Sequence, residues 1–349
     1  MSVVSHPNQV TAEWLTNVLS ASGFSGSVLN LTWQEIGAGQ VADNARFELA
    51  VTGDLPTSVV GKFPSSDPVS KQTGIDGRNY AREVFFYTEL AQSVEVQTPR
   101  VFTTEFDVNN HDFVIVMEDL APGIQIDQMS ECSVDQAALA LEQLAKLHGP
   151  RWADTNLQQH QLLQKAPAAA TDVGELYQIV QPGFLERYEK RLSKRDLTVV
   201  DQFGHQQAAY QNYSGDQTLI HIDYRLDNMI FGGPYALTIL DWQSINLGCA
   251  FNDVSYFMGT SLSPERRGAS ERDLLKHYLE VLASYGVDLD WNSTWNLYRH
   301  YAPAGLTMAV IASMIVGETE RGNDMFMTMA RRSITMSEEL DSLALLANA

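Results

Sequence analysis

The sequence predicts an α+β fold of two parts: a small β-rich part over residues 1–118 and a larger, mainly helical part over residues 119–349. Three observations favour this division. The chain has 349 residues, more than one hydrophobic core usually serves. Short apolar runs typical of strands recur before residue 118. After residue 120, apolar residues follow the spacing of amphipathic helices.

The first part contains four expected strands, over residues 27–33, 45–51, 58–63 and 112–117. Gly37 and Gly39 lie between the first two, where glycine either allows the backbone to approach a ligand or simply forms a hairpin turn. Lys62 stands alone in the apolar third strand. A loop is expected over residues 65–77, and Glu83 lies in the amphipathic helical segment that follows.

The second part begins with an expected helix from Ser133 to His148, which Gly149 and Pro150 would end. Residues 218–220, 229–231 and 237–240 form short apolar runs that predict buried strands, and a Gly-Gly-Pro turn separates the last two. Further helices are expected over residues 171–213 and from residue 267 to the C-terminus.

Polar residues follow these short strands in a pattern that indicates phosphoryl transfer. Asp223 and Asn228 lie five positions apart, and Asp241 ends an apolar run 13 positions after Asn228. A carboxylate can orient a hydroxyl group, while amide and carboxylate oxygens are suitable ligands for a magnesium ion bound to a nucleoside triphosphate. The alternative interpretation is that these Asp and Asn residues only cap a turn.

The run HIDYRLDN, followed by TILDWQ, resembles the aminoglycoside phosphotransferase family with its choline-kinase-like and ecdysteroid-kinase-like relatives. The resemblance covers about residues 35–285 and is strongest at 221–243. It implies a two-lobed protein-kinase-like fold, ATP or GTP as the phosphoryl donor, Mg²⁺ as a cofactor and a small-molecule hydroxyl as the acceptor. The family usually has Gly where this chain has Ile222, next to the catalytic position.

The same resemblance assigns roles to residues of both parts. Asp223 would be catalytic, Asn228 and Asp241 would bind Mg²⁺, and Glu83 would position Lys62 against the phosphates. The other cofactor-binding positions it implies are Gly37 and Gly39 over the phosphates, and Glu118 and Leu120 at the nucleotide base. His148 and His221 are expected to be structural, Arg225 to steady the loop carboxylates, and Asp253 to cap a helix or anchor the loop.

The spacing after Asp241 bears on the acceptor. Only 12 positions separate Asp241 from Asp253, and no Ala-Pro-Glu element follows, so a peptide-binding platform of the protein-kinase type is not expected. The sequence therefore favours a small-molecule kinase. A catalytically silent nucleotide-binding scaffold, or pseudokinase, is the alternative, because of Ile222 and the sparse glycine loop. Retention of all five polar positions argues against that alternative.

Composition narrows the range of partners. The formal charge is −20, from 23 basic and 43 acidic residues, which argues against nucleic acid and makes a neutral or cationic acceptor more favourable than an anionic one. No basic run suggests a membrane surface, and residues 301–317 indicate a buried helix rather than a membrane span.

Residues 1–9 lack a signal-peptide pattern, so a cytoplasmic location is expected. Cys132 and Cys249 are expected to be reduced structural thiols.

Overall fold

The computed structural model describes residues 3–37, 41–164 and 172–348, and its chain forms two compact units. Unit 1 comprises Met1–Ser93, Gln97–Ile124 and Gly232–Ile245, and unit 2 comprises Val94–Val96, Gln125–Phe231 and Asn246–Ala349. The expected division after residue 118 therefore differs from the observed one in three respects. The first part continues to residue 124, residues 232–245 return to it, and residues 94–96 belong to unit 2.

Unit 1 is built on one antiparallel sheet with the strand order β1-β2-β3-β5-β4. Its elements are α1 (Ala12–Ala21), β1 (Gly26–Ile36), β2 (Ala42–Gly53), β3 (Ser58–Pro64), α2 (Pro68–Asp76), α3 (Asn79–Phe85), β4 (Val101–Phe106), β5 (Phe113–Glu118) and β9 (Leu237–Ile239). The short strand β6 (Ile124–Gln125) lies where the chain leaves this unit. The four strands expected in the first part are confirmed.

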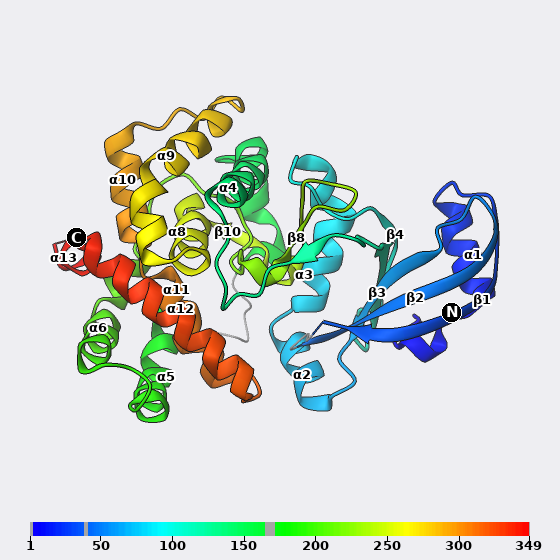
Figure 1. Ribbon diagram of the computed structural model, residues 1–349, viewed down its shortest axis with the longest axis horizontal. Coiled ribbons are helices and arrows are strands. Elements are labelled where there is room, and N and C mark those ends of the chain that lie inside the picture. Colours follow the sequence, from blue (N-terminus) through cyan, green and yellow to red (C-terminus); the bar gives the residue numbers. More distant parts are fainter. Residues whose placement is uncertain (1–2, 38–40, 165–171, 349) are drawn as a thin grey trace. The chain divides into compact units, whose positions relative to one another are not determined.

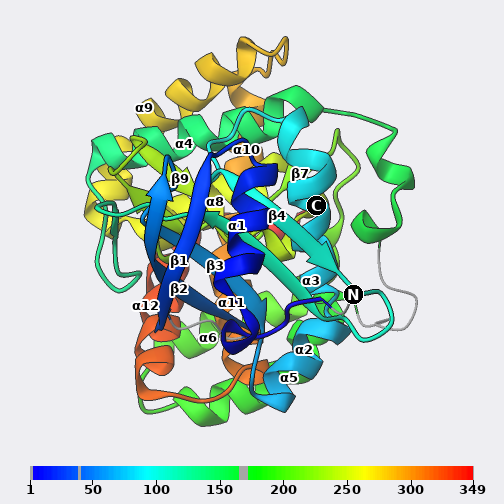
Figure 2. The same ribbon diagram turned by 90° about the vertical axis from the view of Figure 1, so that its right-hand side faces the viewer.

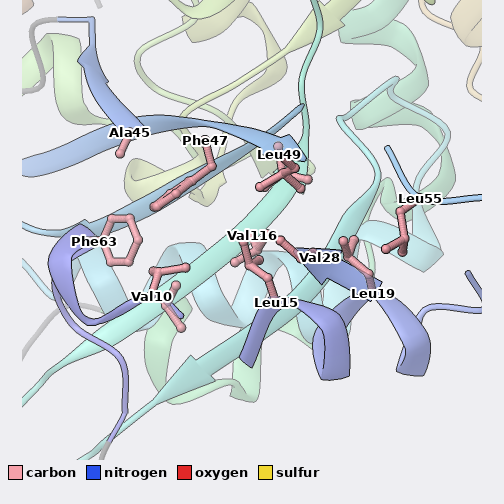
Figure 3. Packing of buried hydrophobic residues seen from close by; sticks show 12 residues of the cluster. Val10, Leu15, Leu19, Val28, Ala45, Phe47, Leu49, Leu55, Phe63 and Val116 are labelled. Carbon is pink, nitrogen blue, oxygen red and sulfur yellow. The ribbon is translucent and has the colours of Figure 1, made fainter. Parts of the chain in front are cut away.

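Both faces of this sheet are covered, and strand β5 shows why. Val114 and Val116 point into a cluster with α1, whereas Phe113, Ile115 and Met117 join a second cluster that includes Tyr80 of α3. This alternation follows from the two-residue period of a strand. Figure 2 shows α1 lying across the sheet, and Figure 3 shows its side chains packed against the strands. The second face, toward α3, also carries the Lys62 side chain, which contacts Glu83 of α3.

The expected loop over residues 65–77 is wrong, because helix α2 occupies most of it. Asp67 caps this helix by accepting a hydrogen bond from the Ser70 amide at 2.8 Å. Pro68 follows at the first helical position, where its fixed φ suits a helix start. Helix α3 then continues directly into a short π-helical segment, η2 (Phe86–Leu90).

Residues 119–124 and 232–245 belong with the sheet because of specific contacts. The Arg46 guanidinium of β2 contacts the buried Asp119 carboxylate at 2.9 Å. Ile239 donates its amide to the Gln97 carbonyl at 2.9 Å, and the Tyr235 hydroxyl donates to the Glu118 carboxylate at 3.0 Å. Trp242, fully buried, stacks on Phe86 with ring centroids 3.8 Å apart. These contacts tie both segments to unit 1.

Unit 2 is mainly helical, and Figure 1 labels most of its elements. These are α4 (Val134–His148), α5 (Val173–Tyr188), α6 (Lys194–His205), α7 (Gln207–Gln211), β7 (Thr218–Ile220), β8 (Met229–Phe231), β10 (Asn246–Gly248), α8 (Ala250–Ser261), α9 (Pro264–Ala283), α10 (Trp291–His300), α11 (Ala304–Ile315), α12 (Glu320–Glu339) and α13 (Ser342–Ala347). Strands β7 and β10 pair antiparallel.

Several expectations for this unit are confirmed. Ser133 caps α4 in a reciprocal capping box with Gln136, and the helix ends at His148 as expected. The apolar stretch over residues 301–317 forms the largely buried helix α11. Within the described ranges, no helix is both long and apolar enough to cross a membrane. Helix α8 has only one residue that is not buried, Asn252, so it forms the centre of the unit.

Candidate active site

The sequence-predicted polar residues fall into two groups, one in each unit. The first group, here called the lysine cluster, consists of Lys62, Glu83 and Asp241 in unit 1. Lys62 shares its face of β3 with Val60, because side chains alternate along a strand, and this face turns toward α3. Its ammonium group lies 2.5 Å from the Glu83 carboxylate and 2.7 Å from that of Asp241. The structure thus brings together three residues that span 180 positions of the chain.

Burial makes the lysine cluster electrostatically strong. The side chains of Lys62 and Glu83 are only 7% and 2% exposed, whereas that of Asp241 is 24% exposed. Burial alone would lower the pKa of Lys62, but Asp241 and Glu83 together raise it, so the ammonium stays charged. Burial raises the pKa of Glu83 to about 7 against the opposing attraction of Lys62. Asp241 is therefore the carboxylate of this cluster best placed to meet a ligand.

Asp241 is held by its neighbours in sequence. Its backbone adopts a left-handed conformation with φ 65°, directly before the turn η8 (Trp242–Ser244). The buried stack of Trp242 on Phe86 fixes the next residue, and the Asn79 side chain donates to the Gln243 carbonyl at 3.3 Å. Asn79 begins α3, the helix that carries Glu83. The same helix therefore positions both carboxylates beside Lys62.

The second group is the Asp223 loop, defined as residues 221–228 in unit 2. The Asp223 carboxylate accepts three hydrogen bonds from side chains. Arg225 Nε and the Tyr256 hydroxyl donate to Oδ1, each at 2.9 Å, and Asn228 Nδ2 donates to Oδ2 at 3.0 Å. Asn228 also donates to the Asp223 carbonyl at 2.8 Å. The amide nitrogen of Asn228 is thus used within the loop, and its oxygen is the atom that can ligate a metal.

These donors determine the charge of Asp223. Burial would raise its pKa, but the charge of Arg225 and the hydrogen bonds from Tyr256 and Asn228 bring the pKa below its usual value. Arg225 also binds the Asp227 carboxylate at 2.9 Å, so it steadies two loop carboxylates as predicted. The loop therefore presents an ionised, oriented carboxylate.

Helix α8 anchors the beginning of the loop. The buried Asp253 carboxylate accepts hydrogen bonds from the amides of His221, at 2.6 Å, and Ile222, at 2.8 Å. It also contacts the fully buried His148, which has a structural place between Asp253 and Tyr278. Of the two roles expected for Asp253, loop anchoring is observed. The N-cap role is wrong, because Cys249 occupies that position.

Ile222, the departure from the family pattern, adopts φ 71°. This left-handed region is easy for glycine and unfavourable for a β-branched side chain. The position next to Asp223 therefore requires a conformation that glycine adopts without strain. The two amide bonds to Asp253 hold Ile222 in it.

The remaining predicted residues of unit 1 lie in the turn after β1 and at the end of β5. Gly37 has φ 72° and open space where a side chain would begin, whereas Gly39 lies outside the described residues. The Glu118 amide donates to the Arg100 carbonyl at 2.9 Å, and its side chain accepts from the Arg100 amide at 2.6 Å. The Leu120 carbonyl accepts from the Gly123 amide at 2.8 Å. The Glu118 amide is therefore committed to the sheet and is not available for a nucleotide base.

Sequence reasoning missed several residues that contact the Asp223 loop, among them Tyr256 and Gln128. Tyr256 lies one helical turn after Asp253 on α8, so both face the loop, and this spacing is the signal that could have found it. Gln128 is fully buried; its side-chain oxygen accepts from the Leu226 amide at 2.8 Å, and its backbone amide donates to Asp227 Oδ1 at 3.0 Å. Gln128 lies in an irregular segment without a pattern that would have marked it.

The chemistry of the donors fits a magnesium ion bound with a nucleotide. In the part of the chain that the structure describes, no group of three or more His, Cys, Asp or Glu side chains could hold a metal by itself. Magnesium, however, is commonly bound by one or two protein oxygens together with phosphates and water. The Asn228 amide oxygen and the Asp241 carboxylate are hard oxygen donors of this kind.

Comparison with solved structures shows the fold. Choline kinase from Cryptosporidium parvum Iowa II superposes with a TM-score of 0.59 and 10% sequence identity, covering 91% of this chain and 92% of that one. Spectinomycin phosphotransferase, in complex with ADP and spectinomycin, gives a TM-score of 0.50 and 12% identity over 98% of each chain. The protein thus has the two-lobed, protein-kinase-like fold of small-molecule phosphotransferases.

Sequence comparison adds the family. Mouse (Mus musculus) acyl-CoA dehydrogenase family member 10 is 28% identical over 142 residues, which are 36% of this chain and 13% of that protein. The match thus spans about an eighth of the length of this relative. The profile of the ecdysteroid kinase-like family matches residues 45–290, a range that includes Lys62, Glu83, Asp223, Asn228 and Asp241. With more than half of its length matched, the chain belongs to the ecdysteroid kinase-like family.

Proposed function

We propose that the protein is a small-molecule kinase that transfers the γ-phosphoryl group of ATP or GTP to a hydroxyl group. The observation that carries this proposal is the Asp223 loop, in which a partly buried carboxylate is kept ionised by three side-chain donors. Such a carboxylate suits phosphoryl transfer, because the reaction depends mainly on positioning and on charge, with little covalent work by the protein.

Asp223 is proposed to orient the acceptor hydroxyl. Its lowered pKa makes it a hydrogen-bond acceptor rather than a strong base. This is sufficient where the transition state is loose and the hydroxyl loses its proton late. Lys62 is proposed to contact the nucleotide phosphates, since its charge is maintained by Glu83 and Asp241. Glu83, the more deeply buried of the two partners, holds the Lys62 side chain in place.

Asn228 and Asp241 are the residues that would hold Mg²⁺. The ion would supply positive charge to the phosphate oxygens, which is the largest electrostatic requirement of the reaction. Gly37 is proposed to cover the phosphates, and the base is proposed to bind the main chain at Glu118 and Leu120. Because the Glu118 amide is committed to Arg100, the base contacts assigned here are the Glu118 carbonyl and the Leu120 amide.

The acceptor is proposed to be a neutral or cationic small molecule that carries a hydroxyl group. The net charge of −20 supports this charge class. Choline and spectinomycin, the acceptors in the names of two structural relatives, are both hydroxylated and belong to it.

The test is magnesium-dependent release of ADP or GDP across a panel of hydroxylated amines, sugars and sterols. We expect one acceptor class to stimulate release and Asp223→Asn to abolish the stimulation. Asp216→Asn, which alters an exposed carboxylate of the same unit, is the matched control and should retain full activity. Asp241→Asn should retain the fold and lose magnesium-dependent nucleotide binding.

The alternative function is a nucleotide-binding scaffold without catalysis, which Ile222 and the sparse glycine loop favour. It predicts saturable nucleotide binding, no stimulated release with any acceptor, and equal behaviour of the native and Asp223→Asn proteins. Stimulated release that depends on Asp223 would exclude it. Absence of both nucleotide binding and release would contradict the kinase and the scaffold together.

A further inference from the structure

Tyr256 is one of the three side-chain donors to Asp223, and it contacts one particular oxygen of that carboxylate. Its side chain is 1% exposed, in the interior of helix α8, and its hydroxyl donates to Asp223 Oδ1 at 2.9 Å. Burial, and then the charge of Asp223, raise the pKa of Tyr256 well above its usual value. The hydroxyl therefore stays protonated and acts as a permanent hydrogen-bond donor to the carboxylate.

The contact distinguishes the two oxygens of Asp223. A carboxylate oxygen has two lone pairs, and those of Oδ1 meet Arg225 Nε and the Tyr256 hydroxyl. Among the described residues, Oδ2 accepts from one side-chain donor, Asn228 Nδ2 at 3.0 Å, which leaves it one lone pair for a further donor. Oδ1 therefore has both lone pairs occupied by donors, whereas Oδ2 can accept one more hydrogen bond.

A purely structural reading of Tyr256 is that its buried hydroxyl simply needs a partner. Other buried tyrosines of unit 2 meet this need in different ways. The Tyr298 hydroxyl donates to the Glu271 carboxylate at 3.0 Å and that of Tyr188 donates to the Asn323 side chain, whereas Tyr177 and Tyr224 use backbone carbonyls. Tyr256 instead donates to the predicted catalytic carboxylate, from the helix that also carries its anchor Asp253.

We propose that Tyr256 is a positioning residue for phosphoryl transfer. With Arg225 it occupies both lone pairs of Asp223 Oδ1, so that Oδ2, beside Asn228, is the oxygen that receives the hydrogen bond of the acceptor hydroxyl. Without Tyr256, the Asp223 carboxylate can rotate and present Oδ1 to the acceptor hydroxyl instead. The carboxylate then spends less time in the orientation that supports phosphoryl transfer. This role rests on the proposed kinase function, because it assumes that Asp223 orients the acceptor.

The kinetic test uses MgATP with water as the acceptor, and measures ADP release by the native, Tyr256→Phe, Asp223→Ala and doubly substituted proteins. We expect Tyr256→Phe to lower the maximal rate about tenfold, as for a lost hydrogen bond to a charged group, without changing the affinity for MgATP. In the Asp223→Ala background, Tyr256→Phe should have no further effect, because Tyr256 acts only through Asp223.

Tyr177→Phe is the matched control, since it removes another buried hydroxyl of the same unit that contacts a backbone carbonyl. It should leave the rate and the affinity for MgATP unchanged. Equal rates of the native and Tyr256→Phe proteins would overturn the proposal. So would a Tyr256→Phe effect of the same size with and without Asp223, because that would indicate a general structural role.

A second measurement does not depend on activity. Site-specific 3-fluorotyrosine at position 256 gives one ¹⁹F resonance, which should shift in Asp223→Ala and stay in place in Asp216→Asn. An unshifted resonance in Asp223→Ala would show that the contact is absent in solution and would overturn the proposal even in an active enzyme.

If the native protein neither binds nor hydrolyses MgATP, the kinase function fails. A ¹⁹F shift would then confirm the contact alone, and the catalytic role of Tyr256 would fall with the kinase.

Discussion

Ile222 combines a β-branched side chain with a left-handed backbone, φ 71°, at the residue before Asp223. Such a conformation costs about 1–2 kcal/mol for a residue with a Cβ atom, and glycine avoids most of this cost. We therefore expect Ile222→Gly to be more stable than Ile222→Ala by about 1 kcal/mol, measured as the free energy of unfolding in urea. Both variants lose the same side-chain packing beyond Cβ, so the comparison isolates the backbone.

Ile179 provides the control pair, because it lies inside helix α5 and its side chain is 67% exposed. At this ordinary helical position the order should reverse, with Ala more stable than Gly by about 1 kcal/mol. The same order at both positions would show that Ile222 is not strained in solution.

The lysine cluster leads to a second prediction for single residues. Lys62→Met leaves the buried Glu83 without its cation, and removal of one partner from a buried pair typically costs about 3–5 kcal/mol. We expect a loss of this size in the free energy of unfolding, and a much smaller loss when the same substitution is made together with Glu83→Gln.

Lys71→Met is the matched control, because Lys71 forms a comparable 2.7 Å ion pair with Asp112 but is 34% exposed. Its loss should be below about 1 kcal/mol. Equal losses for Lys62→Met and Lys71→Met in urea unfolding would contradict the electrostatic strength assigned to the lysine cluster.

Individual residues also show what a sequence can reveal about the site. Asp223 and Asn228 stand out in the sequence through their fixed local spacing, and Lys62 and Glu83 are in contact as expected. The roles of these residues in phosphoryl transfer stay predictions. Tyr256 was not predicted, because its partner Asp223 lies 33 positions away and only the packing of α8 brings the two together. The strain at Ile222 could not be read from residue types, since a φ angle depends on the contacts that hold it.

At the scale of elements, helix α8 determines the position of the Asp223 loop. Asp253 accepts the amides of both His221 and Ile222, and Asn in its place could accept only one of them without an unfavourable contact of its NH₂ group. We expect Asp253→Asn to accelerate hydrogen exchange of these two amides about tenfold or more, as for a lost hydrogen bond to a charged group. Exchange monitored by mass spectrometry over residues 219–226 measures this effect.

Asp135→Asn serves as the control, because Asp135 lies exposed in the first turn of α4. In Asp135→Asn, the rate of hydrogen exchange in residues 219–226 should equal that of the native protein. Unchanged exchange in Asp253→Asn would mean that β7 and the rest of the loop hold the two amides without α8.

The elements themselves were predicted to different degrees, for physical reasons. Strands β3 and β5 were recognisable because both of their faces are largely buried and apolar residues run almost continuously along them. Helix α2 was missed, because it has little apolar surface to give a helical period and only Asp67 and Pro68 mark its start. The return of residues 232–245 to unit 1 depends on Trp242 and Tyr235 finding distant partners, which local patterns do not show.

At the scale of the whole molecule, the reactivity of the two cysteines shows whether unit 2 is folded. Cys132 and Cys249 both belong to unit 2, and both are free thiols buried in the structure, as predicted. Burial raises the pKa of Cys132 to about 12 and that of Cys249 to about 11. Only the thiolate reacts with disulfide reagents, and a raised pKa lowers its fraction at pH 8. Access and ionisation therefore both oppose reaction in the folded protein.

We expect Ellman's reagent at pH 8 to label neither thiol in the native protein, and to label both once urea has unfolded unit 2. Ser284→Cys is the control, since residue 284 is exposed and its thiol should react at once under native conditions. The singly substituted Cys132→Ala and Cys249→Ala proteins assign each signal. The labelling rate should rise with pH up to the raised pKa values, because the thiolate fraction grows over that range. Native labelling of either thiol as fast as that of Ser284→Cys would contradict the burial, and would mean that unit 2 opens locally around the helix that positions Asp223.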